Sequence, residues 1–209
     1  MSSPRSEYSE VSSNSVDFDG ASVVYRPMNT RDMPEVERLH VSQVPGSSEP
    51  SFQMLTNNDI QYELVQQRLP RMFLHQSLYH PHRRTIVAEL SVDGKPQLIG
   101  FASAHVTTKP DWPSVQEPEV DLLTLGVRAE YRRHHVADAL IRAVTVSLVS
   151  TCRFKAGEAG ALVHADIRCG HANRAFFERG MSWTEDKEFQ KTLPWARCDA
   201  TRFVTRISV

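Results

Sequence analysis

The sequence lacks most of the features that mark secreted, membrane or general nucleic-acid-binding proteins. It has only three cysteines, none in a C-x-x-C spacing, so neither a disulfide framework nor a zinc site is indicated. No apolar run approaches the roughly 20 residues of a membrane span, and no secretory leader is recognisable. The formal net charge of −1 provides no basic field for a polyanion. The cysteines are typical of reduced cytosolic or nuclear thiols, and we expect a cytoplasmic protein with no membrane association and no direct nucleic-acid partner.

Composition and patterning predict one domain after a tail. Residues 1–20 are rich in Ser, Asp and Glu and poor in apolar residues, which predicts a disordered tail. Residues 21–209 suffice for a single α/β domain with one substantial core. The expected elements are a strand at 22–28, a helix within 29–43, a helical stretch at 57–79 interrupted near Pro70, strands at 84–92, 97–106 and 122–127, a helix from Val136, a strand at 160–167, a short helix at 172–180, and strands around 181–189 and 201–209.

The stretch LLTLGVRAEYRRHHVADALI, at 122–141, changes its period half-way. Residues 122–127 have the apolar character of a buried strand, whereas the apolar residues from Val136 onward recur at helical spacing. Arg132 and Arg133 therefore lie where a strand gives way to a helix N-terminus. Such a terminus presents unpaired N–H groups, and an arginine can bind two phosphate oxygens at once. The sequence predicts a phosphate-binding corner, with a solvated basic corner as the alternative.

The order of the elements and this corner resemble the GCN5-related N-acetyltransferase (GNAT) superfamily. The run RRHHVA at 132–137 is similar to the superfamily's acetyl-CoA pyrophosphate loop, Arg/Gln-x-x-Gly-x-Gly/Ala. Together with ALVHADI at 161–167, the strand and loop resemble N-terminal α-acetyltransferases of the NatE and NatF type. The resemblance implies a mixed, mostly antiparallel sheet flanked by helices, and acetyl-CoA as the cosubstrate.

The resemblance also implies which residues contact acetyl-CoA. His135 stands where the family has glycine, and a Cβ there narrows the approach of the backbone to phosphate. Asp138 stands where Thr, Ser or Lys is usual, and its carboxylate repels phosphate. We therefore expect weakened cofactor affinity or a reshaped loop. The implied contacts are Leu125, Val127, Arg132, Arg133, His135, Ala137 and Asp138.

Acetyl transfer requires a neutral amine, and an α-amino group titrates near 7.7 to 8.0. The resemblance places the catalytic histidine at His164 and shows Asp121 where the family has a tyrosine. Asp121 could be the base itself, or could raise the pKa of a nearby His164. The alternative is a structurally satisfied His164 and an Asp121 that ends a loop. A second family tyrosine, the thiolate acid, falls near Phe177, which cannot donate a proton.

The remaining candidates concern substrate and metal. By the resemblance, the substrate is contacted by Val44 and Pro45 in QVPGSSEPSF and by Trp195 in the last hairpin. Metal ligands must converge on one point, and adjacent histidines such as His134 and His135 point in different directions, so we expect no metal site.

The implied function is transfer of acetyl from acetyl-CoA to a protein N-terminal α-amine. Two alternatives stay open. One is a weakly active or inactive accessory subunit of an N-terminal acetyltransferase complex, with a large auxiliary subunit and the ribosome as partners. The other is an acetyltransferase for lysine or a small amine.

Overall fold

The structure, a computed structural model, describes most of the predicted domain. The described residues are 17–18, 21–41, 53–56, 70–107, 117–152, 160–168, 174–193 and 198–209. Three predicted substrate contacts, Val44, Pro45 and Trp195, lie outside these ranges, as do residues 1–16 of the predicted tail.

The described chain alternates strands and helices. In chain order the elements are β1 (Asp17–Phe18), β2 (Ala21–Pro27), α1 (Met33–Val41), β3 (Gln53–Thr56), α3 (Pro70–Tyr79), β4 (Arg83–Val92), β5 (Lys95–Val106), β6 (Glu119–Val127), the 3-10 helix η1 (Ala129–Tyr131), α4 (Val136–Thr151), β7 (Ala161–Arg168), α5 (Arg174–Arg179), β8 (Thr184–Leu193) and β9 (Cys198–Ile207).

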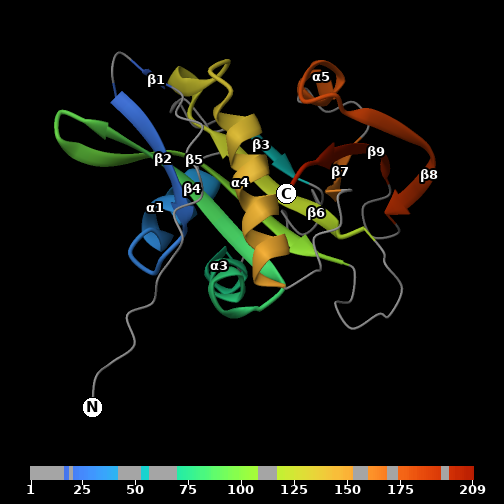
Figure 1. The fold of residues 1–209 in the computed structure, drawn as a ribbon, viewed down its shortest axis with the longest axis horizontal. Helices are drawn as coiled ribbons and strands as arrows, with labels where there is room; N and C mark the ends of the chain where they lie inside the picture. The colour runs from blue at the N-terminus through green and yellow to red at the C-terminus, as the bar shows by residue number, and fades with distance from the viewer. Residues whose placement is uncertain are drawn as a thin grey trace.

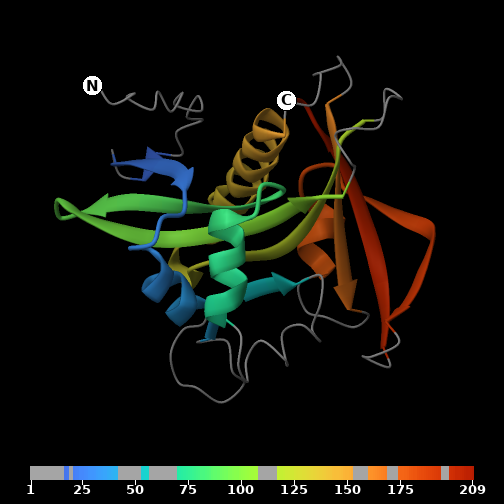
Figure 2. The ribbon, with the colours of Figure 1, turned by 90° about the horizontal axis from the view of Figure 1, so that it is seen from below.

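The strands form one mixed sheet in the order β1-β2-β4-β5-β6-β7-β9-β8, with β3 paired to β6. Among the described strands only β6 and β7 pair in parallel, and every other pairing is antiparallel. The predicted mixed, mostly antiparallel sheet is therefore confirmed. In Figure 2 strands β7, β8 and β9 run steeply across the view, whereas β4 and β5 lie along it.

Helices cover both faces of the sheet (Figures 1 and 2). Helix α4 lies on one face, where Leu140, Val144 and Leu148 are fully buried in the larger core cluster. Helices α1 and α3 lie on the other face, over a smaller cluster that includes Val87 and Phe101. The apolar stripe predicted from Val136 onward is thus the buried face of α4. No helix in the described part of the chain combines the length and apolar character of a membrane span.

The hairpin β4–β5 forms as its turn sequence predicts. Asp93 and Gly94 both have positive φ, at 51° and 73°. Positive φ at both central residues is the requirement of a type I′ turn, which Asp-Gly meets at low cost. The hairpin carries His105 to the far end of β5, close to β6.

The hydrophobic pattern of the sequence does not predict strands β1 and β3. Strand β1 is two residues long and pairs with β2, so the paired part of the chain begins at Asp17, ahead of the tail boundary at residue 20. Strand β3 pairs residues 53–56 with 124–127 of β6. Both are set by an open sheet edge that offers unpaired N–H and C=O groups, which a local pattern cannot reveal. Helix α3 begins at Pro70, where the missing N–H costs no helical bond.

Candidate active site

The site lies where β6 and β7 part. The parallel pairing joins Glu119–Asp121 of β6 to Leu162–His164 of β7 and extends no further. From Thr124 onward the same edge of β6 is paired with β3, with Leu125 opposite Leu55 and Val127 opposite Gln53. Asp121 and His164 are therefore the last pair before the two strands diverge.

Asp121 and His164 face each other because direct strand partners point to the same side of a sheet. His164 Nδ1 lies 3.5 Å from Asp121 Oδ1, and the two side chains are 10% and 23% exposed. Burial alone would raise the pKa of Asp121, but its contact with His164 and the charges of His105 and Arg202 outweigh burial and lower it. Asp121 is therefore ionised at neutral pH. The structure brings together the two predicted catalytic residues.

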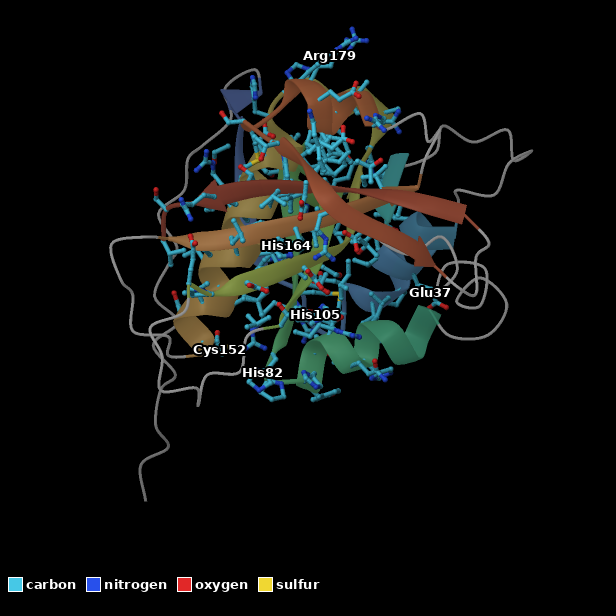
Figure 3. All side chains as sticks on the ribbon, turned by 90° about the vertical axis from the view of Figure 1, so that its right-hand side faces the viewer. Glu37, His82, His105, Cys152, His164 and Arg179 are labelled. Atoms are coloured by element: carbon cyan, nitrogen blue, oxygen red, sulfur yellow. The ribbon has the colours of Figure 1, made fainter. Side chains whose placement is uncertain are left out.

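His105 lies on the other side of Asp121 and was not predicted from the sequence. It is the strand partner of Asp121 on β5, and its Nε2 is 3.9 Å from Asp121 Oδ2. His105 on β5 and His164 on β7, both labelled in Figure 3, flank Asp121 on β6, the strand between them. Burial, together with the positive charges of Arg83 and His80, lowers the pKa of His105 despite Asp121. His105 Nδ1 is buried and has no hydrogen-bond partner among the described residues.

A buried ion pair adjoins the same cluster. Arg202 of β9 is the strand partner of Asp166 of β7, and the guanidinium binds the carboxylate through two hydrogen bonds of 2.7 and 3.0 Å. The remaining Nη1 lies 3.4 Å from His164 Nδ1 in hydrogen-bond geometry. This pair was also not predicted. The sequence does contain a signal for this pair. Asp166 lies inside an apolar strand, and a charged residue there is rarely buried without a partner.

The predicted phosphate corner has the backbone shape that its glycine-containing counterpart would adopt. Arg133 and His135 have φ of 65° and 57°, in the left-handed region that glycine adopts most readily. The His135 side chain is 84% exposed, and its Nδ1 lies 3.1 Å from Asp138 Oδ2. His135 is also the N-cap of α4, and its side chain makes no capping hydrogen bond. The first-turn N–H groups of α4 are thus not capped by the residue best placed to do so.

The other predicted cofactor contacts lie around this corner. Arg132 donates from Nε to the carbonyl of Val127 at 3.3 Å, which joins the loop to the end of β6. Leu125 and Val127 bury their side chains in the core, so only their backbone groups are at the strand edge. Ala137 packs against the same core cluster.

Phe177 packs in the core and carries no exposed group. It is fully buried, with its ring 5.0 Å from that of Trp183 and 5.4 Å from that of Phe203. The position offers no proton donor to a thiolate. Within the described ranges no group of three or more His, Cys, Asp or Glu side chains is arranged to hold a metal ion.

Comparison with known families identifies the fold and the chemistry. Residues 52–183, more than half of the chain, match the model of the acetyltransferase (GNAT) family. The chain belongs to the GNAT acetyltransferase family. The matched range includes the corner, Asp121 and His164. This GNAT protein is an acetyl-CoA-dependent acetyltransferase. Acetyl-CoA supplies the activated acetyl group as a thioester. No curated protein matches the sequence.

Solved structures with a similar fold include two of Arabidopsis thaliana NAA60. The crystal structure of Arabidopsis thaliana NAA60 with acetyl-CoA is 20% identical, with a TM-score of 0.56 over 90% of this chain and 99% of that chain. NAA60 with a bisubstrate analogue is 21% identical, with a TM-score of 0.53 over 88% and 98%. A putative GNAT acetyltransferase from Desulfovibrio desulfuricans is 17% identical, with a TM-score of 0.53 over 88% and 98%. At these identities the likeness is one of fold.

The corner of this GNAT protein fits the diphosphate of acetyl-CoA. Left-handed backbone at two positions of a loop can direct successive N–H groups toward one anion, and the N-terminus of α4 adds the positive end of its dipole. The His135 side chain is exposed, and whether its Cβ narrows the approach to phosphate stays a prediction. Asp138 is the remaining unfavourable charge, and it lies beside the His135 ring.

Proposed function

We propose that this acetyltransferase acetylates the α-amine of a protein N-terminus, with Asp121 and His164 as the reacting pair. The observation that carries the proposal is their position as the last pair before β6 and β7 part. The loop at 132–138 would hold the diphosphate through its backbone N–H groups and Arg133. Val44, Pro45 and Trp195, outside the described residues, are the peptide contacts that we propose.

The lowered pKa of Asp121 favours an α-amine over a lysine side chain as the acetyl acceptor. A free α-amine titrates near 7.7 to 8.0, so a sizeable fraction is neutral at physiological pH, whereas lysine titrates near 10.4. Asp121 is a weak base because its pKa is lowered. Such a site can take a proton from an amine that is already weakly basic as it reacts. It has no strong base with which to neutralise a lysine ammonium first.

The substrate test is acetylation of synthetic peptides that differ in their first two residues, followed by mass spectrometry. A matched series has a blocked N-terminus and a free lysine, and spermidine is the small-amine arm. We expect acetylation of free N-termini only. Acetylation confined to lysine or spermidine would contradict the proposal. Binding of acetyl-CoA without acetylation of any amine would favour the accessory-subunit alternative.

The site test uses Asp121→Asn and His164→Ala. Each should lower kcat by about 10² to 10⁴ and leave acetyl-CoA affinity nearly unchanged, because the losses affect proton transfer and not cofactor binding. The matched control is Glu119→Gln, an exposed carboxylate two residues earlier on the same strand. Full activity in both site variants would show that Asp121 and His164 are not the reacting pair.

The proposal extends to location and partners. An enzyme that modifies protein N-termini with acetyl-CoA would work in the cytoplasm, where nascent chains meet the cosubstrate. A large auxiliary subunit and the ribosome are the partners we propose to test by co-purification.

A further inference from the structure

His164 has two competing partners at a single ring nitrogen. Its Nδ1 lies 3.5 Å from Asp121 Oδ1 and 3.4 Å from Arg202 Nη1. A neutral imidazole has one N–H and one bare nitrogen. Nδ1 can therefore carry a proton toward Asp121 or accept one from Arg202, but it cannot do both. The choice decides whether Nε2 is a proton acceptor or an N–H donor.

The surroundings of Arg202 hold it in place against His164. Two of its nitrogens are fixed on Asp166, whose side chain is 4% exposed, and this fork leaves the planar guanidinium little freedom to rotate. Asp186 of β8 is its strand partner on the other side. A guanidinium only donates hydrogen bonds and is not deprotonated in proteins. Its Nη1 therefore always presents N–H groups toward His164.

The charged groups around His164 and Arg202 come from four strands. Asp121 lies on β6, Asp166 on β7 itself, Asp186 on β8 and Arg202 on β9. The charge of Asp121 is also shared with His105 on β5. The contact with Asp121 favours a proton on His164 Nδ1, whereas the contact with Arg202 requires a bare Nδ1, and the Asp121 carboxylate also has the positive charges of His105 and Arg202 near it.

We propose that Arg202, clamped by Asp166, is a positioning residue that holds neutral His164 with Nδ1 bare and its proton on Nε2. The inference rests on the proposed function and assigns separate roles to the pair. His164 is a hydrogen-bond donor, through Nε2–H, to negative charge that develops on the acetyl group. Asp121 takes the proton that the amine nitrogen loses as the N–C bond forms and the C–S bond breaks. The electron pair of the broken bond leaves on sulfur, which is protonated from solvent.

The first test reads the tautomer directly and needs no activity. Histidine-selective ¹⁵N labelling of the whole protein, with His164 assigned by its loss in His164→Gln, shows which ring nitrogen carries the proton at pH 8. We expect Nε2–H in the wild type and a shift to Nδ1–H in Asp166→Asn/Arg202→Met. The matched control, Glu117→Gln/Arg206→Met, removes a similar but exposed pair that also involves β9 and should leave the tautomer unchanged. Nδ1–H in the wild type overturns the proposal.

The second test is kinetic. A glutamine side chain can place its N–H₂ near the position of Nε2, whereas an asparagine reaches only that of Nδ1. If His164 is a donor, His164→Gln should keep kcat within about tenfold of wild type, whereas His164→Asn and His164→Ala lose about 10² to 10⁴. A glutamine variant as slow as alanine, with an unchanged melting temperature, overturns the donor role. Absence of peptide acetylation by the wild type would refute the proposed function alone, because the tautomer is measured independently.

Discussion

At the scale of single residues, the corner shows how a non-glycine residue can take a glycine position. His135 adopts a left-handed φ of 57°, which L-residues visit at a cost of roughly 1–2 kcal/mol. Histidine is among the residues enriched there, and its exposed ring meets no clash. The loop therefore keeps its anion-binding shape while the strain lowers the stability of the fold.

Substitutions at the corner should separate charge from backbone shape. Arg133→Ala should weaken acetyl-CoA binding by roughly 1.5–3 kcal/mol, the value of a charge-assisted contact to phosphate. His135→Gly should hold that affinity steady or raise it, because glycine adopts the same φ without strain. Calorimetric titration measures both. Arg142→Ala is the control, since Arg142 is exposed on α4 beyond its first turn. Equal affinity in wild type and Arg132→Ala/Arg133→Ala would show that the diphosphate binds elsewhere.

At the scale of elements, β6 has partners along both edges. Strand β5 pairs with one edge, and β7 followed by β3 pairs with the other. If acetyl-CoA lies along Leu125 and Val127, as the family resemblance implies, it uses the edge that β3 covers. The cofactor and β3 then compete for the same backbone groups.

Proline in β3 tests this competition. Successive N–H groups of a strand point to opposite sides, so either Met54→Pro or Leu55→Pro removes a donor to β6. Loss of one ladder bond is worth about 0.5–1.5 kcal/mol, so the effective variant should bind acetyl-CoA up to about tenfold more tightly. The alanine variants at the same positions keep their N–H groups and serve as controls. Unchanged affinity in both proline variants would mean that β3 and the cofactor do not share an edge.

The elements also show what the sequence could and could not predict. The helix from Val136, the Asp-Gly hairpin and the pairing of Asp121 with His164 follow from local period, turn chemistry and family resemblance. His105, Asp166 and Arg202 join the site only through strand register, which links residues far apart in the chain. Strand β3 was missed for the same reason, because its partner is an edge formed by distant residues.

At the scale of the whole molecule, one ion-pair network joins strands β2 and β4 to the start of helix α1. Arg26 of β2 binds Asp32, just before α1, through contacts of 2.6 and 2.8 Å, and also binds Glu89 of β4. The backbone N–H of Asn29 donates to Asp32 at 2.8 Å. Burial would raise the pKa of Asp32, but these hydrogen bonds outweigh it and lower the pKa. The lowered pKa means that the ionised carboxylate stabilises the folded state.

The contribution of Asp32 should depend on pH with a defined sign. Because its folded pKa is below its unfolded value near 3.9, the stabilisation is complete above about pH 4 to 5 and is lost as pH falls through the folded pKa. Asp32→Asn should lower the free energy of unfolding by about 1.5–3 kcal/mol at pH 7 and by less at pH 3. Urea unfolding at both values measures the difference. Glu178→Gln, in an exposed pair with Arg174, should cost under about 0.5 kcal/mol throughout. A pH-independent effect of Asp32→Asn would contradict the assignment.

The strand pairing of β3 has a consequence for how cofactor binding would be detected. Amides of 124–127 are already hydrogen-bonded without a ligand, so they should exchange slowly with deuterated solvent in the free protein. If acetyl-CoA replaces β3, those amides stay protected while the backbone of 53–56 loses its partner and exchanges faster. An exchange experiment would then record binding as a local gain in exchange at 53–56. Ligand arrival would be visible mainly through the segment that it displaces.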